Sequence, residues 1–484
     1  MLASILTSAD LRYPSADESF SPSERFPEYP FDHVATRPNA VYAAVRTLFA
    51  QAGLDAEHFG TSRWNPLGEF IAPGSRVFVL CNFVYHRRPQ DSERDFQAKC
   101  IHASVLRALC DYALIAVGPE GRIRFGNSPL QSTDWRGVLA ETGATAMLDF
   151  YRKQGSPVEA RDLRLFVVER TALGRVTHTE ERDTEADAVE IALGADSLLS
   201  EIAGDPSRPA RFRVSDYRPE RIEAFHSGNR HRYVVHRELL EADTVISLPK
   251  LKTHEKVGIT CGIKGFVGMV GHKDCLAHHR YGPPELGGDE HPPGLRFLSP
   301  VSAFQDWVQG RDLEAPLQGL MQIVDRTGRR ILRRLGADMA GAWHGNDTCW
   351  RMALDLTQIA HYGGVDGRMH PERQRRHLCL IDGIVAGERD GPLIPRPVDA
   401  GTLLFSDSVI EADRAACLLM GFEPERIPML REALRDTHHP LRGPETPRIW
   451  CNGERVEPQA IRPALGRAFR PPRGWKRHLQ PENR

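Results

Sequence analysis

The stretch LPKLKTHEKVGITCGIKG, residues 248–265, concentrates basic side chains among glycines directly after an apolar run. Glycine lets the backbone approach a ligand closely, and clustered lysines favour a carboxylate or a phosphate. A histidine in the same stretch could move a proton near neutral pH. The stretch therefore predicts a site for a small anionic molecule, with a solvated basic loop as the alternative. Its basic residues are Lys250, Lys252, His254, Lys256 and Lys264.

Four residues are our candidates for catalysis: Lys250, Lys252, His254 and Glu388. A buried lysine with a lowered pKa could act as a base or a nucleophile, or the two lysines could clamp an anion. Glu388 belongs to a glycine loop that carries acids, residues 386–393. Its carboxylates could accept hydrogen bonds from substrate hydroxyls, bind Mg²⁺ or act as a general base.

Candidate substrate-binding residues follow the ends of predicted strands. Arg76–Leu80, Arg122–Phe125, Thr244–Leu248 and His377–Val385 are apolar runs suited to buried strands, and Pro249 should end the third. Open α/β sheets bind ligands beyond the carboxyl ends of their strands. We therefore expect a shared ligand site, against the alternative that each loop only turns the chain. Its members are Asn82, Asn127, Ser128, Gln131, Lys264, Asp382, Asp390 and Gly391.

A second group, His272, His278, His279 and Asp289, could bind a divalent metal such as Zn²⁺, Fe²⁺ or Ni²⁺. The spacing matches no standard metal motif, so a hydrogen-bonded loop is the alternative. The nine cysteines are scattered without a CxxC pair, which predicts no iron–sulfur cluster and fits a reducing compartment. Beyond a possible divalent metal, the cofactor is not indicated.

Strands that alternate with helices indicate an α/β protein with a doubly wound, mostly parallel sheet and helical inserts; two α/β lobes are the alternative. Residues 1–70 are expected to form an irregular arm and a helix, and 71–295 an α/β core that carries the basic stretch. Residues 296–346 suggest a helical insert or lid, 347–440 the second part of the core, and 441–484 a hairpin and a basic tail.

Four finer predictions concern single elements. The pattern of Asp95–Leu114 predicts one helix, and the second half of Arg218–Glu241 is predicted to be helical too. Ile449–Val456 contains Asn-Gly, the strongest two-residue hairpin signal. The arginine- and proline-rich tail from Arg462 is expected to be a disordered basic end.

Charge and hydropathy narrow the partners of this 484-residue chain. The formal net charge of -1 gives no global field to recruit nucleic acid or an anionic membrane. No apolar run is long enough to span a bilayer, so we expect a cytoplasmic protein. The oligomeric state is not indicated. Phosphate-loop, dinucleotide-binding and serine-hydrolase motifs are missing, so those activities lack support.

Several motifs in order resemble the domain of unknown function 362 family, from about Arg76 to Ile427. They are GNSPLQSTDW, ADTVISLPKLKTHEKVGITCGIKGFVG, DGIVAGERDGPLIPRP and AGTLLFSDSVIEADRAACLLMGFEPERI. Many relatives carry a ferredoxin-type cysteine cluster, which this chain lacks. The first strand ends in Leu80-Cys81-Asn82 where the family has Lys-Pro-Asn, and the second shows Gly126-Asn127 where it has Gly-Asp. The family has no assigned activity; in overall arrangement it is distantly similar to lactate racemases, which use a nickel-pincer nucleotide.

Two functions are therefore expected. The first is an enzyme that acts on a small anionic, hydroxylated metabolite by acid–base chemistry, with metal assistance as an option. The second is a non-catalytic anion-binding or assembly protein that uses the same basic stretch. Acids, cations and a histidine together at strand ends favour the enzyme, because a binder would need only the cations.

Overall fold

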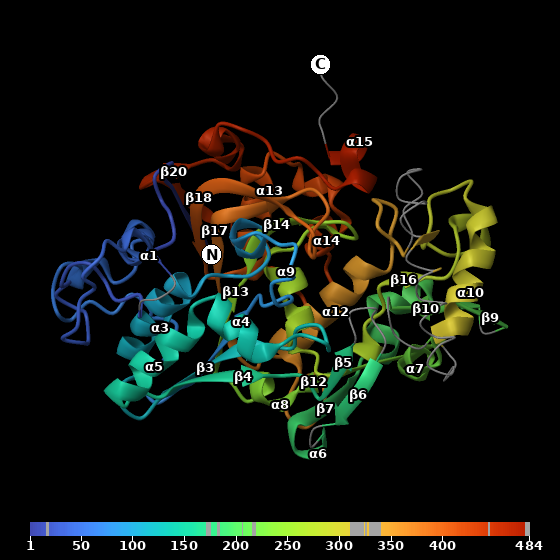
Figure 1. The fold of residues 1–484 in the computed structure, drawn as a ribbon, viewed down its shortest axis with the longest axis horizontal. Coiled ribbons are helices and arrows are strands. Elements are labelled where there is room, and N and C mark those ends of the chain that lie inside the picture. Colours follow the sequence, from blue (N-terminus) through green and yellow to red (C-terminus); the bar gives the residue numbers. More distant parts are fainter. Residues whose placement is uncertain are drawn as a thin grey trace.

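The computed structural model describes residues 1–15, 19–170, 176–181, 184–205, 207–214, 219–309, 324, 327–328, 340–443 and 446–479. Its central feature is an eleven-stranded mixed sheet, which confirms the α/β class (Figure 1). The strand order along the main path is β20-β19-β1-β18-β17-β13-β2-β3-β4. From β17 to β4 all neighbours on this path are parallel, whereas β18 is antiparallel to both β17 and β1.

The sheet draws its strands from all parts of the chain. The parallel strands are β2 (Arg76–Cys81), β3 (Arg122–Asn127), β4 (Val158–Asp162), β13 (Thr244–Leu248) and β17 (Arg376–Glu388). The others on the main path are β1 (Leu2–Thr7), β18 (Arg396–Ser406), β19 (Arg448–Cys451) and β20 (Glu454–Val456). Beside the main path lie β14 (Lys250–His254), which pairs with β17, and β15 (Gly258–Ile259), which pairs with β14.

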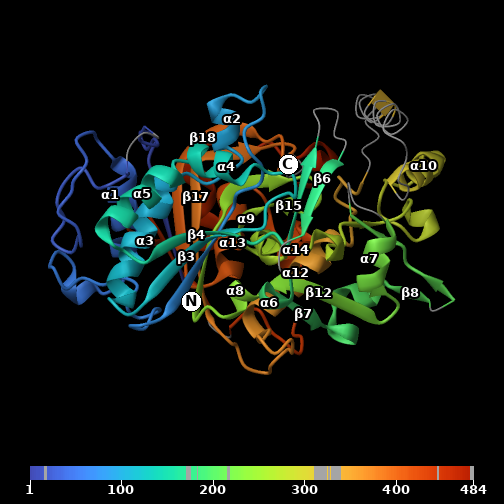
Figure 2. The ribbon, with the colours of Figure 1, turned by 60° about the horizontal axis from the view of Figure 1, so that its bottom comes forward.

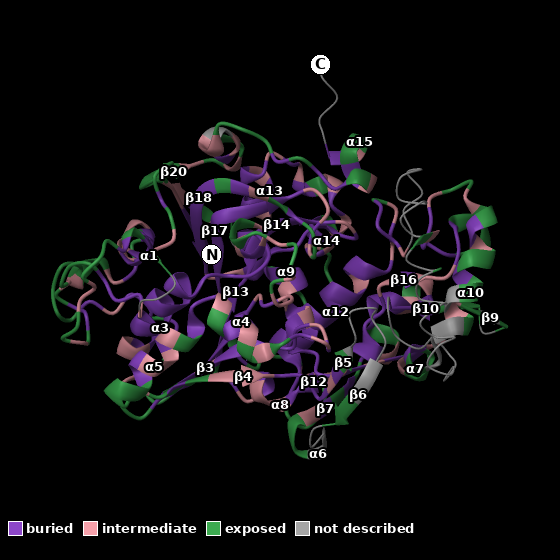
Figure 3. Cartoon of the chain, viewed as in Figure 1, coloured by how far each residue is buried: buried purple, intermediate pink, exposed green. Residues whose placement is uncertain are grey.

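Helices cover both faces of the sheet, which explains why its strands are apolar on both sides. Successive strand residues point to opposite faces. Val77 and Val79 of β2 accordingly pack in one buried cluster, and Phe78 and Leu80 in the other. The sheet is therefore the buried middle layer of three (Figures 1, 2 and 3). One face carries α1 (Ala40–Gln51), α3 (Ala103–Val117) and α5 (Ala144–Gln154); the other carries α9 (Cys261–Gly265), α12 (Cys349–Tyr362), α13 (Val409–Leu419) and α14 (Pro428–Glu432).

Smaller elements surround this core. The short strands are β5 (Phe166–Arg170), β6 (Val176–Glu181), β7 (Ala188–Ala192), β8 (Gly204–Asp205), β9 (Arg208–Pro209), β10 (Phe212–Arg213), β11 (His226–Ser227), β12 (Arg230–His236) and β16 (His279–Arg280). The short helices are α2 (Glu93–Gln97), α4 (Trp135–Glu141), α6 (Thr184–Asp187), α7 (Pro219–Phe225), α8 (Arg237–Leu240), α10 (Ser299–Gln309) and α15 (Lys476–Leu479). No helix in the described part of the chain has the length and apolar character of a membrane span.

Several predicted elements differ from the observed ones. The helix expected in the second half of Arg218–Glu241 is mostly the strand β12, because its alternating apolar residues pack at period two against β7. Residues 1–70 hold more than an arm and a helix, since β1 is an interior strand of the main sheet. The stretch expected to be a basic loop begins as the buried strand β14.

As far as Leu479, the C-terminal region packs on the protein rather than forming a disordered basic end. Asn452 and Gly453 form the predicted hairpin turn between β19 and β20, both with positive φ. Further on, Phe469, Trp475 and Leu479 are buried, so the basic tail packs through its few apolar residues.

Most of the predicted insert or lid, residues 310–323 in particular, lies outside the described residues.

Candidate functional site

Strand β14 places the predicted basic residues inside the protein. Pro249 separates it from β13, and β14 then pairs in parallel with β17, Lys250 opposite Asp382 and, after a register shift, Lys252 opposite Gly387. Side chains two apart on a strand share a face, so Lys250, Lys252 and His254 point to the same side. All three are buried.

The positive charge of Lys250 is balanced by the carboxylate of Asp382. Its Nζ lies 3.0 Å from Asp382 Oδ2 and also donates to the Tyr13 hydroxyl, which in turn donates to Asp382 Oδ1 at 2.6 Å. The backbone N–H of His102 donates to Asp382 Oδ2 at 3.0 Å. Burial lowers the pKa of Lys250, and Asp382 opposes this by favouring the charged ammonium. The network joins β14, β17 and the N-terminal segment.

Among the described residues, Lys252 is buried without an acidic partner. Its Nζ donates to Asn82 Oδ1 at 2.8 Å and to the backbone carbonyl of Lys99 at 2.6 Å. Burial lowers the pKa of Lys252 to about 7. In the neutral amine, two N–H groups satisfy these two acceptors and the nitrogen lone pair is left for chemistry. Lys252 is therefore suited to act as a base or a nucleophile near neutral pH.

The partners of both lysines come from an interruption in a predicted helix. The sequence pattern predicts one helix over Asp95–Leu114, but α2 ends at Gln97 and α3 begins at Ala103. The five residues between them supply the Lys99 carbonyl to Lys252 and the His102 N–H to Asp382. The break between α2 and α3 thus lies at the backbone groups that bond to Lys252 and Asp382.

His254 is a neutral histidine with a defined tautomer. Its Nδ1 accepts the backbone N–H of Lys256 at 3.1 Å, so the ring proton resides on Nε2. No described residue accepts that Nε2–H. Burial lowers the pKa of His254 well below its usual value, and Lys264, His278, Lys256 and Lys252 lower it further. The Nε2–H of the neutral ring can therefore donate a hydrogen bond to a ligand.

Two further buried lysines approach from other elements. Lys264 lies on α9, and its ammonium has no hydrogen bond or ion pair within the described residues. Lys273, in a short 3-10 helix (Lys273–Cys275), donates from Nζ only to the carbonyl of Val267, at 2.9 Å. Burial lowers the pKa of Lys273 to about 7, and Lys264 contributes to the same shift. We call Lys252, His254, Lys256, Lys264, Lys273 and His278 the basic cluster.

Several polar side-chain atoms at the end of β3 and in the loop after it lack hydrogen-bond partners in the described residues. Ser128 N–H donates to the carbonyl of Gly268 at 2.6 Å, next to Val267. Ser128 Oγ, Asn127 Oδ1 and both amide atoms of Gln131 are buried and have no hydrogen-bond partner within the described residues. Unsatisfied buried polar atoms are costly and call for an explanation, such as a ligand.

The predicted acids are occupied elsewhere. Glu388 is buried and binds the tail, with Oε2 accepting from Arg467 Nη2 at 2.5 Å and from Arg470 N–H at 2.9 Å. Asp390 accepts from Arg473 Nε at 2.7 Å. Gly391 is a contact of this loop with β14, because a Cβ there would lie 2.1 Å from the Thr253 carbonyl.

Of the four predicted metal ligands, His278 and Asp289 are held by hydrogen bonds, whereas the Nδ1 atoms of His272 and His279 are buried without a hydrogen-bond partner in the described residues. His278 Nδ1 donates to the carbonyl of Leu276 at 2.9 Å, and Asp289 accepts from Thr348 Oγ1 and Arg280 N–H, both at 2.6 Å. His279 Nε2 is 4.0 Å from a Glu290 oxygen. His272 Nδ1 is 3.6 Å from Asp274. Within the described residues, no three His, Cys, Asp or Glu side chains are grouped to hold a metal ion; metal binding stays a prediction.

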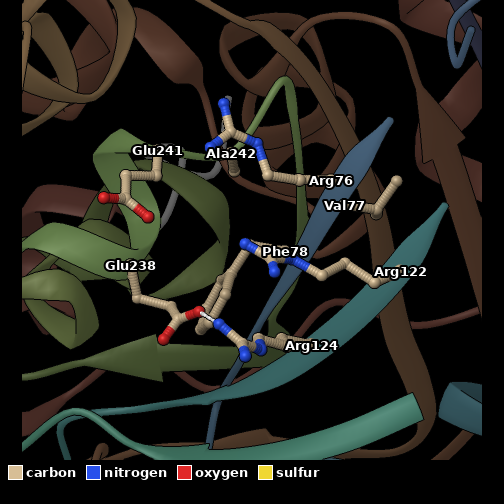
Figure 4. A pocket seen from close by; sticks show the side chains of 8 residues that line it. All are labelled: Arg76, Val77, Phe78, Arg122, Arg124, Glu238, Glu241 and Ala242. Atoms are coloured by element: carbon tan, nitrogen blue, oxygen red, sulfur yellow. Dashed lines mark hydrogen bonds and ion pairs between the residues drawn. The ribbon is translucent and has the colours of Figure 1, made fainter. Parts of the chain in front are cut away.

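A surface hollow at the opposite, amino-terminal end of the strands is lined by Arg76, Arg122, Arg124, Glu238 and Glu241 (Figure 4). Arg124 forms ion pairs with Glu238 and Glu159, and Arg76 pairs with Asp243. Its charges of both signs are largely matched on the surface, so it resembles a salt-bridge network more than a ligand site.

Sequence reasoning missed Tyr13, Lys99 and His102, and it grouped Lys273 with the candidate metal ligands rather than with the anion site. One signal could have found the lysines. The chain has 63 basic residues, yet only eight are lysine. Six of those eight are buried in this region. They are Lys99, Lys250, Lys252, Lys256, Lys264 and Lys273.

These features define an α/β protein with a buried lysine-rich site at the carboxyl ends of its strands. A family model described as a domain of unknown function (DUF362) matches residues 159–418. The chain belongs to this family. The match includes β13, β14, α9 and β17, and begins after β2 and β3. No curated protein and no solved structure matches the chain.

Proposed function

We propose that this protein is an enzyme that binds a small anionic, hydroxylated metabolite in the basic cluster and acts on it by acid–base chemistry. The observation that carries the proposal is the use of lysine. Nearly every other cation of the chain is arginine, which stays charged at any physiological pH. Lysine can lose its proton when buried, so the burial of six of the eight lysines in this region supports a chemical need for titratable amines.

Lys252 and His254 have complementary roles in this proposal. Neutral Lys252 would take a proton from the substrate, using the lone pair that Asn82 and the Lys99 carbonyl leave free. His254, as a neutral imidazole, would donate a hydrogen bond from its Nε2–H to a substrate oxygen that gains negative charge in the reaction. Lys250, already paired with Asp382, would hold β14 in place. A base beside a neutral hydrogen-bond donor is a combination suited to taking a proton from a substrate.

The charge balance supports an anionic substrate. Burying several ammonium groups without counter-charges is unfavourable, and they respond by losing protons. A bound anion would restore the charged form of the lysines that do not take part in the chemistry. Metal assistance is not part of the proposal, since the described residues offer no grouped ligand set.

Solvent-deuterium exchange tests the proposal even though the product is not identified. The protein would be incubated in D₂O with a panel of hydroxylated carboxylates and phosphate esters, followed by NMR and mass spectrometry. We expect deuterium incorporation or conversion of at least one compound, reduced at least 100-fold in Lys252→Met and in His254→Gln. Lys153→Met, at an exposed lysine of α5, is the matched control. Saturable anion binding without exchange or product would overturn the enzyme proposal.

That last outcome would favour the second candidate, a non-catalytic anion-binding protein. One observation supports it: Glu388 and Asp390, the acids expected to assist catalysis, are bound to arginines of the tail. A binder needs the cations and no free carboxylate.

A cytoplasmic location is part of the proposal. All nine cysteines are free thiols, and eight of them are buried. Free cysteines fit a reducing compartment, where disulfides rarely persist. Localisation of a fluorescent fusion would test this.

A further inference from the structure

We propose that Lys264, Lys273, Ser128 and Gln131 form a subsite for a phosphoryl group, so that the substrate is a phosphorylated hydroxy compound. This inference rests on the proposed function and names the substrate class of the same site. Lys273 is not predicted from the sequence as an anion-binding residue. Lys264 and Lys273 belong to α9 and to the 3-10 helix Lys273–Cys275, whereas Lys252 belongs to β14.

One short segment, Val267–Gly268, links Lys273 to the backbone of Ser128, and Gln131 follows in the same loop as Ser128. Lys273 Nζ binds the carbonyl of Val267, and Ser128 N–H binds the carbonyl of Gly268. Lys264 lies one helical turn before this segment and acts on the pKa of Lys273. A Cβ at Gly268 would lie 3.1 Å from Asn127 Cβ, so the segment packs directly on the end of β3.

The loop after β3 that carries Ser128 and Gln131 is fixed by hydrogen bonds from the buried Arg164. Arg164 Nη1 donates to the carbonyls of Gln131 at 2.9 Å and Thr133 at 2.8 Å, and its other nitrogens pair with Asp162. Arg164 is buried, and its guanidinium is thereby occupied. The loop keeps its shape while the Ser128 hydroxyl and the Gln131 amide are left without partners in the described part of the chain, which is the arrangement of a preformed ligand site.

The type of cation favours phosphate over carboxylate. A planar carboxylate is best matched by the fork of an arginine, whereas lysines act as point charges that can surround a tetrahedral group from different elements. Here the lysines come from α9 and from a separate 3-10 helix, and hydroxyl and amide donors come from a third segment. A dianion would also balance two ammonium groups, which a monocarboxylate would not.

The unpaired acceptors indicate the rest of the ligand. Asn127 Oδ1 is buried and unsatisfied among the described residues, while Asn127 Nδ2 already donates to the carbonyl of Phe83 at 3.0 Å. An amide oxygen would repel a phosphate but would accept a hydrogen bond from a hydroxyl. We therefore place a hydroxyl-bearing carbon near Asn127, between the phosphoryl subsite and Lys252.

Calorimetric titration tests the subsite with simple anions: inorganic phosphate and sulfate as tetrahedral dianions, acetate and malonate as carboxylates. We expect the tetrahedral anions to bind at least tenfold more tightly than the carboxylates. Lys264→Met and Lys273→Met should each weaken sulfate binding at least tenfold, and Lys153→Met should leave it unchanged. Sulfate binding at pH 8 should take up protons, because Lys273, whose pKa burial lowers to about 7, is then mostly neutral; at pH 6 the uptake should shrink.

Ser128→Ala and Gln131→Met keep the test valid if the lysine variants fold poorly. Both remove polar groups that have no partner within the described residues, so they should weaken sulfate binding several-fold without lowering the thermal midpoint. Equal or tighter binding of the carboxylates, or binding indifferent to all four substitutions, would overturn the subsite. Carboxylate binding that depends on Lys252 would then leave the proposed function standing. Binding of no anion at all would overturn both.

Discussion

Lys250 and Asp382 form a fully buried ion pair, with 3.0 Å between Nζ and Oδ2, across the parallel pairing of β14 and β17. Tyr13 closes the arrangement by contacting both residues, and its ring stacks on His102 with 4.3 Å between centroids. The pair thus connects the N-terminal segment, the interruption between α2 and α3, and the strand that carries Lys252 and His254. A buried pair of this kind fixes geometry more than it adds stability.

Breaking this pair on one side should be costly. Asp382→Leu leaves Lys250 buried and unpaired, and we expect a loss of about 3–5 kcal/mol in the free energy of unfolding, measured by urea denaturation. The double substitution Lys250→Met/Asp382→Leu should recover most of that loss because no uncompensated charge remains. Equal destabilisation by the single and the double variant would contradict the assignment of Lys250 as the main partner of Asp382.

Lys252 should make stability depend on pH in the alkaline range. Burial lowers its pKa from 10.5 to about 7, so the unfolded chain binds more protons than the folded one between these values. Stability should therefore rise with pH across this window, by up to about 1.4 kcal/mol per pH unit for a single group. Urea denaturation at pH 7 and pH 9 should show a smaller rise for Lys252→Met than for the wild type. Identical pH dependence would mean that Lys252 has an ordinary pKa.

The sheet could be predicted because its signals are local. The apolar runs that form β2, β3, β13 and β17 mark buried strands, and Pro249 marks the end of β13. β14 could not be predicted in the same way. Its residues, KLKTH, alternate between polar and other side chains with a period of two, as in a strand. The face that carries Lys250, Lys252 and His254 is buried, although lysine is usually exposed. Only the tertiary pairing with β17 shows that this strand is internal.

The assembly of the site was also beyond local reasoning. Tyr13 is 369 residues from Asp382 in the chain, and no pattern connects them. The interruption of the predicted helix at residues 98–102 carries no proline or glycine, and its Lys99 carbonyl and His102 N–H bond to Lys252 and Asp382. Glu388 and Asp390 do lie next to β14, but their arginine partners come from a tail that composition alone predicts to be disordered.

Asp413 should control the position of Lys264. Its buried carboxyl accepts the N–H groups of Gly262 at 2.6 Å and Ile263 at 2.9 Å, at the start of α9. Asp413→Leu leaves both donors unsatisfied and should cost about 2–4 kcal/mol of stability. Asp413→Asn keeps one acceptor and should cost less. Sulfate affinity, measured by calorimetry on folded protein, should fall in the same order, since α9 carries Lys264. Unchanged sulfate affinity in a destabilised Asp413→Leu protein would show that α9 holds its place without this contact.

Glu388 should anchor the tail. Glu388→Gln weakens the charged contacts with Arg467 and Arg470, so we expect faster proteolytic removal of the segment after Phe469 and a loss of roughly 1–3 kcal/mol in stability. The substitution Arg467→Met removes the partner instead and should loosen the same segment. Limited proteolysis followed by mass spectrometry distinguishes this from a catalytic role. If Glu388→Gln abolished turnover while Arg467→Met and the tail were unaffected, the carboxylate would belong to the reaction instead. The anchoring role predicts that both variants act alike, since each breaks the same pair.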